Sequence, residues 1–237
     1  MAAEDTERVP VRWGFGDACI GFALAYVLVA LLTPLIYKAT GQDLDTVHRD
    51  LPLSTVALTQ VPFYGGMLGW ALIASFRKGR GPVADYRIQL RLVDLPIGVV
   101  VGVLTQLAGN LVLKPVVWFT SYTTEDIERP ARELADKARG SGVVLLVLVV
   151  AIAAPIVEEI FFRGLVLRSL ERRMGTAWAV VATGAIFAAT HFEPLQFPAL
   201  FLFGLVAGVL VARTGRLGPA VWAHLAFNGV AVFSLLH

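Results

Sequence analysis

The chain has 237 residues, of which 57% are apolar and only 16% are charged, and its mean hydropathy is +0.70. Soluble domains average about 45–50% apolar and about 25% charged residues, so this composition excludes an ordinary soluble protein and predicts a multi-pass protein of the cell membrane. The net charge of +2 is too small to indicate nucleic-acid binding, and the single cysteine, Cys19, excludes an internal disulfide framework.

Apolar runs that approach the roughly 20 residues needed to cross a bilayer core recur along the whole chain. They predict an all-α membrane helix bundle, with about seven (six to eight) transmembrane helices in a single integral-membrane domain over residues 1–237. The segment before Asp17 lacks the basic region of a signal peptide, so the first helix is expected to remain in the protein. The expected spans are 17–37, 55–76, 95–119, 142–167, 177–191, 197–213 and 217–236.

Lysine and arginine are unevenly distributed between the two sides of these spans. Twelve lie on the side of the N-terminus and six on the other side, and short loops rich in these residues stay in the cytoplasm. The distribution therefore predicts a cytoplasmic N-terminus. The twelve are Arg8, Arg12, Arg77, Lys78, Arg80, Arg87, Arg91, Arg168, Arg172, Arg173, Arg213 and Arg216, and the six are Lys38, Arg49, Arg129, Arg132, Lys137 and Arg139.

The longest polar connection, residues 123–140, has the pattern of a short amphipathic helix. Ile127, Ala131, Leu134 and Ala138 recur in it at helical spacing. We expect this helix to rest on the membrane surface, and the alternative interpretation is a gate for a substrate.

Three pairs of glycines lie four residues apart within the spans, a spacing that lets transmembrane backbones approach closely. We expect them to pack helices within one chain, with a dimer contact as the alternative, and the oligomeric state stays open. The pairs are Gly65/Gly69, Gly98/Gly102 and Gly204/Gly208.

Polar residues inside the later spans are the main indication of function, because a charged side chain at mid-bilayer costs about 2.5–3.5 kcal/mol. The fourth span holds Glu158, Glu159 and Arg163. Glu159 and Arg163 share a helix face and are expected to pair, whereas Glu158 is turned about 100° away and is left for another role. The fifth span holds His191, and the seventh holds His224 with Asn228 four residues later. Each group taken alone also has a purely structural interpretation. The Glu–Arg pair would hold packed helices together, a histidine would lie at the level of the lipid headgroups, and the asparagine would hydrogen-bond a neighbouring helix.

The expected depths of these residues raise a difficulty. At about 1.5 Å of rise per residue, Glu158 and His224 lie toward the cytoplasmic side, but His191 lies near the opposite side. His191 can join the others if the fourth helix continues past the membrane through Arg173, or if the helices tilt.

Three short motifs resemble those of a known family. EEIFFR, FAATH and HLAFN, which begin at residues 158, 187 and 224, resemble the EExxxR, FxxxH and HxxxN/D motifs of the CAAX-protease and bacteriocin-processing (CPBP, or Abi) family of intramembrane proteases. The resemblance implies a catalytic core within residues 142–230, with helices around a membrane-embedded cavity that opens to the cytoplasm. It also implies an endopeptidase acting on a membrane-associated peptide or protein, in CAAX processing, peptide maturation or bacteriocin immunity. The implied catalytic residues are Glu158, His191, His224 and Asn228, supported by Glu159 and Arg163.

Hydrolysis of a peptide bond requires an activated water, stabilisation of the oxyanion and a proton for the leaving amine. We hypothesise that Glu158, helped by His191, activates the water, and that His224 and Asn228 polarise the carbonyl and hold the oxyanion. A metal-dependent version stays open, in which Glu158, His191 and His224 hold Zn²⁺, although the chain has no HExxH motif. The glutamate-type protease needs no cofactor.

Two other functions are compatible with these residues. A non-proteolytic scaffold or regulator would keep the same fold and bind a partner protein in the membrane. A transporter or proton relay would use Glu158 and His191 to carry protons, and it would need more polar residues along a continuous path than the early spans provide.

Overall fold

The computed structural model describes residues 11–46 and 50–237. Arg8 and Arg49, two of the residues counted above for orientation, lie outside this described part. Regular structure in the described part is entirely helical, which confirms the predicted all-α bundle. In chain order the elements are α1 (Phe15–Ala39), α2 (Leu53–Lys78), α3 (Pro82–Asp85), α4 (Asp94–Phe119), α5 (Thr124–Ala135), α6 (Ser141–Leu146), η2 (Val147–Ala153), α7 (Ala154–Glu158), η3 (Glu159–Leu167), α8 (Arg168–Met174), α9 (Thr176–Ala189), α10 (Phe197–Thr214) and α11 (Gly218–Leu236).

Within the described residues, six helices are long and apolar enough to cross a membrane. The expected fifth span, 177–191, is a shorter apolar helix, α9, of 14 residues. The expected fourth span is much longer than 142–167, because α6 to α8 form one uninterrupted helix of 34 residues, Ser141–Met174. At ~1.5 Å per residue this helix measures roughly 51 Å, well beyond a bilayer core of about 30 Å. It continues through Arg173 to Met174, which is one of the two arrangements expected to let His191 join the site.

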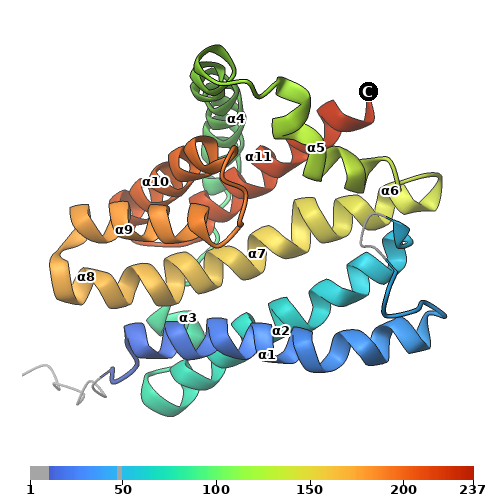
Figure 1. The fold of residues 1–237 in the computed structure, drawn as a ribbon. Helices are drawn as coiled ribbons and strands as arrows, with labels where there is room; N and C mark the ends of the chain where they lie inside the picture. Colours follow the sequence, from blue (N-terminus) through green and yellow to red (C-terminus); the bar gives the residue numbers. More distant parts are fainter. Residues whose placement is uncertain (1–10, 47–49) are drawn as a thin grey trace, which may run out of the picture.

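This long helix is the centre of the bundle. Figure 1 shows it running between the pair α1 and α2 on one side and the group α4, α9, α10 and α11 on the other. Two stretches of it, η2 and η3, are π-helical, and they lie on either side of α7, which ends at Glu158. Such π-helical segments are rare and occur often at functional sites.

Glycine contacts explain how closely the outer helices pack. A Cβ atom at Gly98 or Gly102 of α4 would collide with the backbone of α11 near Ala223, and one at Gly204 of α10 would lie 2.7 Å from Gly184 of α9. Packing within the chain is therefore confirmed for two of the three glycine pairs.

The prediction is wrong for the third pair. A Cβ atom at Gly65 or Gly69 would meet no described residue within 4 Å. The close contact between α2 and α1 comes instead from Gly66, where a Cβ atom would lie 2.5 Å from the Cα of Ala25.

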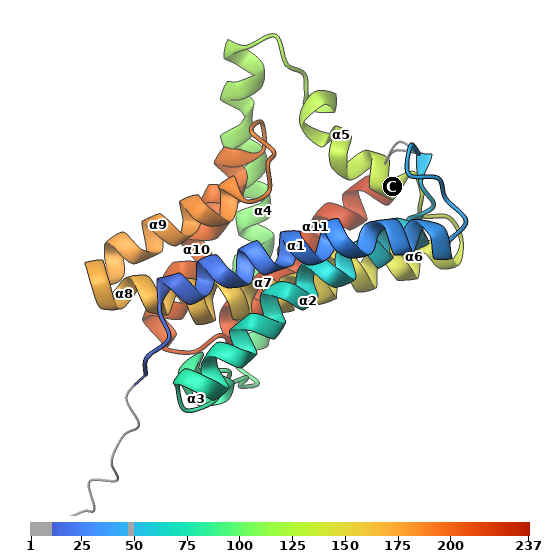
Figure 2. The same ribbon diagram turned by 60° about the horizontal axis from the view of Figure 1, so that its bottom comes forward.

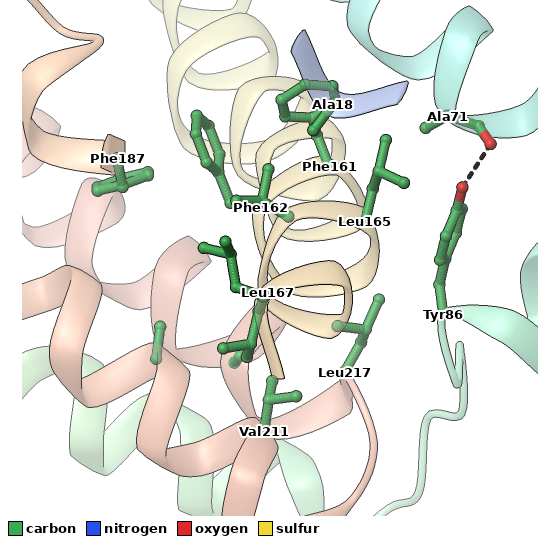
Figure 3. Close-up of a cluster of buried hydrophobic side chains, with 14 of the residues drawn as sticks. Ala18, Ala71, Tyr86, Phe161, Phe162, Leu165, Leu167, Phe187, Val211 and Leu217 are labelled. Carbon is green, nitrogen blue, oxygen red and sulfur yellow. Dashed lines mark hydrogen bonds between the residues drawn. The ribbon is translucent and has the colours of Figure 1, made fainter. Parts of the chain in front are cut away.

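Tyr86, in the loop after α3, fixes the long helix against α2. Its ring is fully buried, and its hydroxyl donates a hydrogen bond of 2.5 Å to the carbonyl of Ala71 (Figure 3). The ring lies against Gly164, where a Cβ atom would come within 2.9 Å of it. In Figure 3, Phe161, Phe162 and Leu165 project from the same helix into the surrounding core.

Candidate functional site

The four residues expected to be catalytic lie around one cavity. Glu158 from the long helix, His191 from the turn after α9, and His224 and Asn228 from α11 all line a cavity of about 610 Å³. The cavity is deep in the protein, since Glu158 is only 9% exposed and His224 only 2%. The tertiary structure thus brings together residues that lie on three separate elements.

Glu159 and Arg163 form the expected pair one turn apart. Nη1 of Arg163 lies 2.9 Å from Oε1 of Glu159, and both side chains are fully buried. This contact is an ion pair without the geometry of a directed hydrogen bond, because Nη1 of Arg163 makes none in the described structure. The guanidinium also lies 4.6 Å from the centre of the Phe187 ring, in a cation–π contact. Phe187, the first residue of the FAATH motif, thereby covers the buried cation.

Glu159 has a second partner that sequence spacing does not reveal. Nδ1 of His224 lies 2.8 Å from the same oxygen, Oε1 of Glu159. A carboxylate can only accept, so Nδ1 carries the hydrogen and donates it. This bond orients the imidazole and leaves Nε2 of His224 on the side of Glu158, 3.7 Å from its Oε2.

Tyr64 of α2 is a site residue that the sequence interpretation missed. Its hydroxyl donates a long hydrogen bond of 3.4 Å to Oε1 of Glu158. Glu158 therefore contacts Tyr64 through one oxygen and His224 through the other. A signal was present in the sequence, because Gln60 and Tyr64 are polar residues four apart in a predominantly apolar span.

His191 is held by the end of its own helix. Its Nδ1 donates to the carbonyl of Phe187 at 2.7 Å, so the neutral ring has Nε2 available as an acceptor. The next residue, Phe192, has a φ of 55°, in the left-handed region that bulky residues rarely adopt. Its ring packs edge-on against Tyr26 of α1, at 6.3 Å between centroids, and this contact ties the strained turn to the other side of the bundle.

Asn228 makes a hydrogen bond that follows from the π-helical geometry. In η2 the N–H of Ala154 pairs with the carbonyl of Val149, five residues earlier. The next N–H in this pattern would come from residue 155 and pair with Val150, but residue 155 is proline and has no N–H. Nδ2 of Asn228 donates to the Val150 carbonyl at 2.8 Å instead. Asn228 thus supplies the donor that Pro155 lacks and fixes α11 against the helix that carries Glu158.

This geometry predicts a specific rescue. Replacing Asn228 by leucine is expected to lower the free energy of unfolding by about 1–3 kcal/mol, because the Val150 carbonyl loses its donor. Adding Pro155→Ala should recover part of this loss, since alanine restores an N–H at residue 155. Thermal unfolding of both variants in detergent measures the effect. Equal stability of Asn228→Leu and wild type would contradict this role for Asn228.

The amphipathic helix expected in residues 123–140 is α5, and it lines the cavity as well. Figure 2 shows it running from the end of α4 toward α6 and the C-terminal end of α11. Its buried side includes Ile127, whose carbonyl accepts a 2.9 Å hydrogen bond from Nε2 of Gln196. At its start, a hydrogen bond from the N–H of Thr123 lowers the pKa of Asp126 and completes a capping box. One side of α5 therefore forms a wall of the cavity, a position compatible with the gate that was the alternative interpretation.

The geometry of the site also bears on whether its residues could hold a metal ion. Among residues 11–46 and 50–237, no three His, Cys, Asp or Glu side chains converge in a way that could hold a metal ion. Glu158 and His224 approach each other, but His191 does not complete a three-ligand set with them. The described side chains therefore do not fit the alternative zinc site formed by Glu158, His191 and His224.

Comparisons with known proteins bear on the part of the chain that holds the motifs. Residues 140–230 match the family described as type II CAAX prenyl endopeptidase Rce1-like. A stretch of 94 residues is 30% identical to a Bacillus subtilis (strain 168) protein named "Putative membrane peptidase YdiL", and it covers 40% of this chain and 38% of that protein. No solved structure gives a significant match. Over residues 140–230 the chain is therefore similar to Rce1-like type II CAAX prenyl endopeptidases, which supports the CPBP-family resemblance of the three motifs.

Proposed function

We propose that the chain is an intramembrane endopeptidase that hydrolyses a peptide bond of a membrane-associated peptide or protein. The observation that carries the proposal is the meeting of Glu158, His191, His224 and Asn228 around one cavity of about 610 Å³. The family match over residues 140–230 and the peptidase name of the relative support it.

In the proposed mechanism, Glu158 is the general base. It takes a proton from a water molecule as the water oxygen bonds to the carbonyl carbon of the substrate, and Nε2 of His191 accepts the second hydrogen of that water. When the carbon–nitrogen bond breaks, Glu158 passes its proton to the leaving amine. Tyr64, which donates to the other oxygen of Glu158, positions the carboxylate.

The oxyanion is held from the side of α11. The hydrogen bond from Nδ1 to Glu159 orients His224, and when Nε2 also carries a hydrogen it donates that hydrogen to the carbonyl oxygen. The amide of Asn228 has two hydrogens and gives one to Val150, so the second can be donated to the same oxygen. Arg163 compensates the charge of Glu159 in this buried environment. The mechanism is of the glutamate type, and metal analysis with a chelation assay would test it against the zinc alternative.

Substrate identification tests the proposal. Membrane peptides from cells producing the wild-type chain are compared by mass spectrometry with those from cells producing Glu158→Gln. We expect a defined set of cleavage products with the wild type that the variant does not produce. Identical peptide sets, together with an unchanged effect on a membrane partner, would favour the non-proteolytic scaffold instead.

Orientation in the membrane is a second proposal, because two expectations conflict in this structure. The cavity extends to α5, at the opposite end of the bundle from the start of α1. If the N-terminus is cytoplasmic, as the Lys and Arg distribution predicts, this end faces away from the cytoplasm, whereas the family resemblance implies a cytoplasmic opening. We propose the orientation given by the charge distribution.

Cysteine labelling checks this orientation. In a Cys19→Ala background, a membrane-impermeant maleimide is expected to label Arg129→Cys on α5 in intact cells. Arg91→Cys, before α4, should react only after lysis. Both side chains lie at exposed positions. The reverse labelling pattern would place the α5 end of the cavity in the cytoplasm.

A further inference from the structure

Polar side chains also line the cavity on walls away from the catalytic cluster. Gln60 on α2, and Gln106 and Asn110 on α4, all face it. Gln106 and Asn110 are four residues apart and share a helix face, as Gln60 and Tyr64 do on α2. Gln60 and Gln106 are half-buried and Asn110 is exposed. The exposed residues of these helices that do not line the cavity include the apolar Val61 and Leu104.

The hydrogen-bonding capacity of these carboxamides is mostly unused within the described chain. Nε2 of Gln106 donates to Oδ1 of Asn110 at 3.4 Å, which is long for a hydrogen bond. Oε1 of Gln106, Nδ2 of Asn110 and the whole carboxamide of Gln60 have no partner among the described residues. Unpaired amides within membrane-spanning helices are costly, and those that face a cavity usually act on what enters it.

The chemistry of the walls indicates the ligand. Each carboxamide offers an acceptor and a donor, which match the N–H and C=O of a peptide backbone. A peptide that leaves water for an apolar cavity needs such partners, because its backbone groups otherwise remain unpaired. The surrounding wall is apolar, with Val56, Leu113 and Leu145 among its residues, and so suits uncharged side chains.

We propose that Gln60, Gln106 and Asn110 form a subsite that binds the backbone of an extended, apolar peptide segment next to the bond that is cleaved. The inference rests on the proposed peptidase function and specifies its substrate as an unfolded stretch without charged side chains. The two charged residues of α5 that line the cavity, Glu128 and Arg132, pair with each other, so the α5 wall carries no net charge.

The test measures binding without turnover. Full-length protein carrying Glu158→Gln is placed in lipid nanodiscs and titrated with a short fluorescent peptide of alternating leucine and threonine, capped at both ends. Adding Gln60→Leu, Gln106→Leu or Asn110→Leu is expected to weaken binding about 3–10-fold each, as loss of one hydrogen bond does. The protein that carries Glu158→Gln alone, the parent, should bind the same peptide more weakly when alternate backbone nitrogens are methylated. This methylation should lower the affinity of the leucine variants by a smaller factor.

Thr105→Val is the matched control, since Thr105 is also a polar residue of α4 but bonds to its own helix at Val101 and does not line the cavity. Its affinity should equal that of the parent. Unchanged affinity in all three leucine variants, or no saturable binding by the parent, would overturn the subsite. Tighter binding of the peptide by the leucine variants would also overturn it, because the carboxamides would then oppose binding. Because the assay needs no cleavage, these outcomes are independent of whether the wild type proves to be a peptidase.

Discussion

Replacement of Glu158 by glutamine is expected to lower the rate of peptide cleavage about 10²–10⁴-fold, the usual contribution of a general base. The amide keeps the size of the side chain but does not accept a proton from water. Stability should change little, because the polar contacts of the Glu158 carboxylate with the described residues are two long ones, at 3.4 Å to Tyr64 and 3.7 Å to His224. The measurement is single-turnover cleavage of a peptide identified from the membrane comparison, together with thermal unfolding in detergent.

Glu193→Gln is the matched control for this prediction. Glu193 also lines the cavity, two residues after His191, but it has no place in the proposed mechanism. Its cleavage rate should stay within about twofold of wild type, as for substitutions away from critical groups. Near-normal cleavage by Glu158→Gln would end the assignment of Glu158 as the base.

Replacement of Arg163 by methionine is expected to lower the free energy of unfolding by about 3–5 kcal/mol. Removing one partner of a buried ion pair leaves the other charge uncompensated in an apolar environment. Here the remaining carboxylate would be Glu159, which is fully buried and would keep, among the described residues, its hydrogen bond from His224. Methionine keeps much of the side-chain volume beneath the Phe187 ring, so the measured loss reports mainly on the charge.

Two further variants separate this effect from a general loss of packing. Adding Glu159→Gln to Arg163→Met should restore most of the stability, because the pair is then neutral. Arg132→Met breaks the exposed pair with Glu128, which has the same spacing on α5, and should cost less than about 1 kcal/mol. Equal losses in Arg163→Met and Arg132→Met would contradict the importance of burial.

The sequence by itself determined the helical class and the identity of the polar residues that enter the site. Long apolar runs in a membrane must be helical, since lipid offers no partners for the backbone. The pairing of Glu159 with Arg163 was also predictable, because residues four apart on a helix are neighbours wherever that helix lies.

The contacts that give each residue its role were decided only by the tertiary structure. His224 meets Glu159 across 65 positions of sequence, Asn228 meets Val150 across 78, and Tyr64 meets Glu158 across 94. These contacts depend on where helices cross and on the π-helical stretch before Pro155, and neither is a local property of the sequence. The same is true of α5, whose apolar face suited a membrane surface equally well and which the fold places beside the cavity. Helical spacing shows which side chains share a face, but only the packed bundle determines what that face meets.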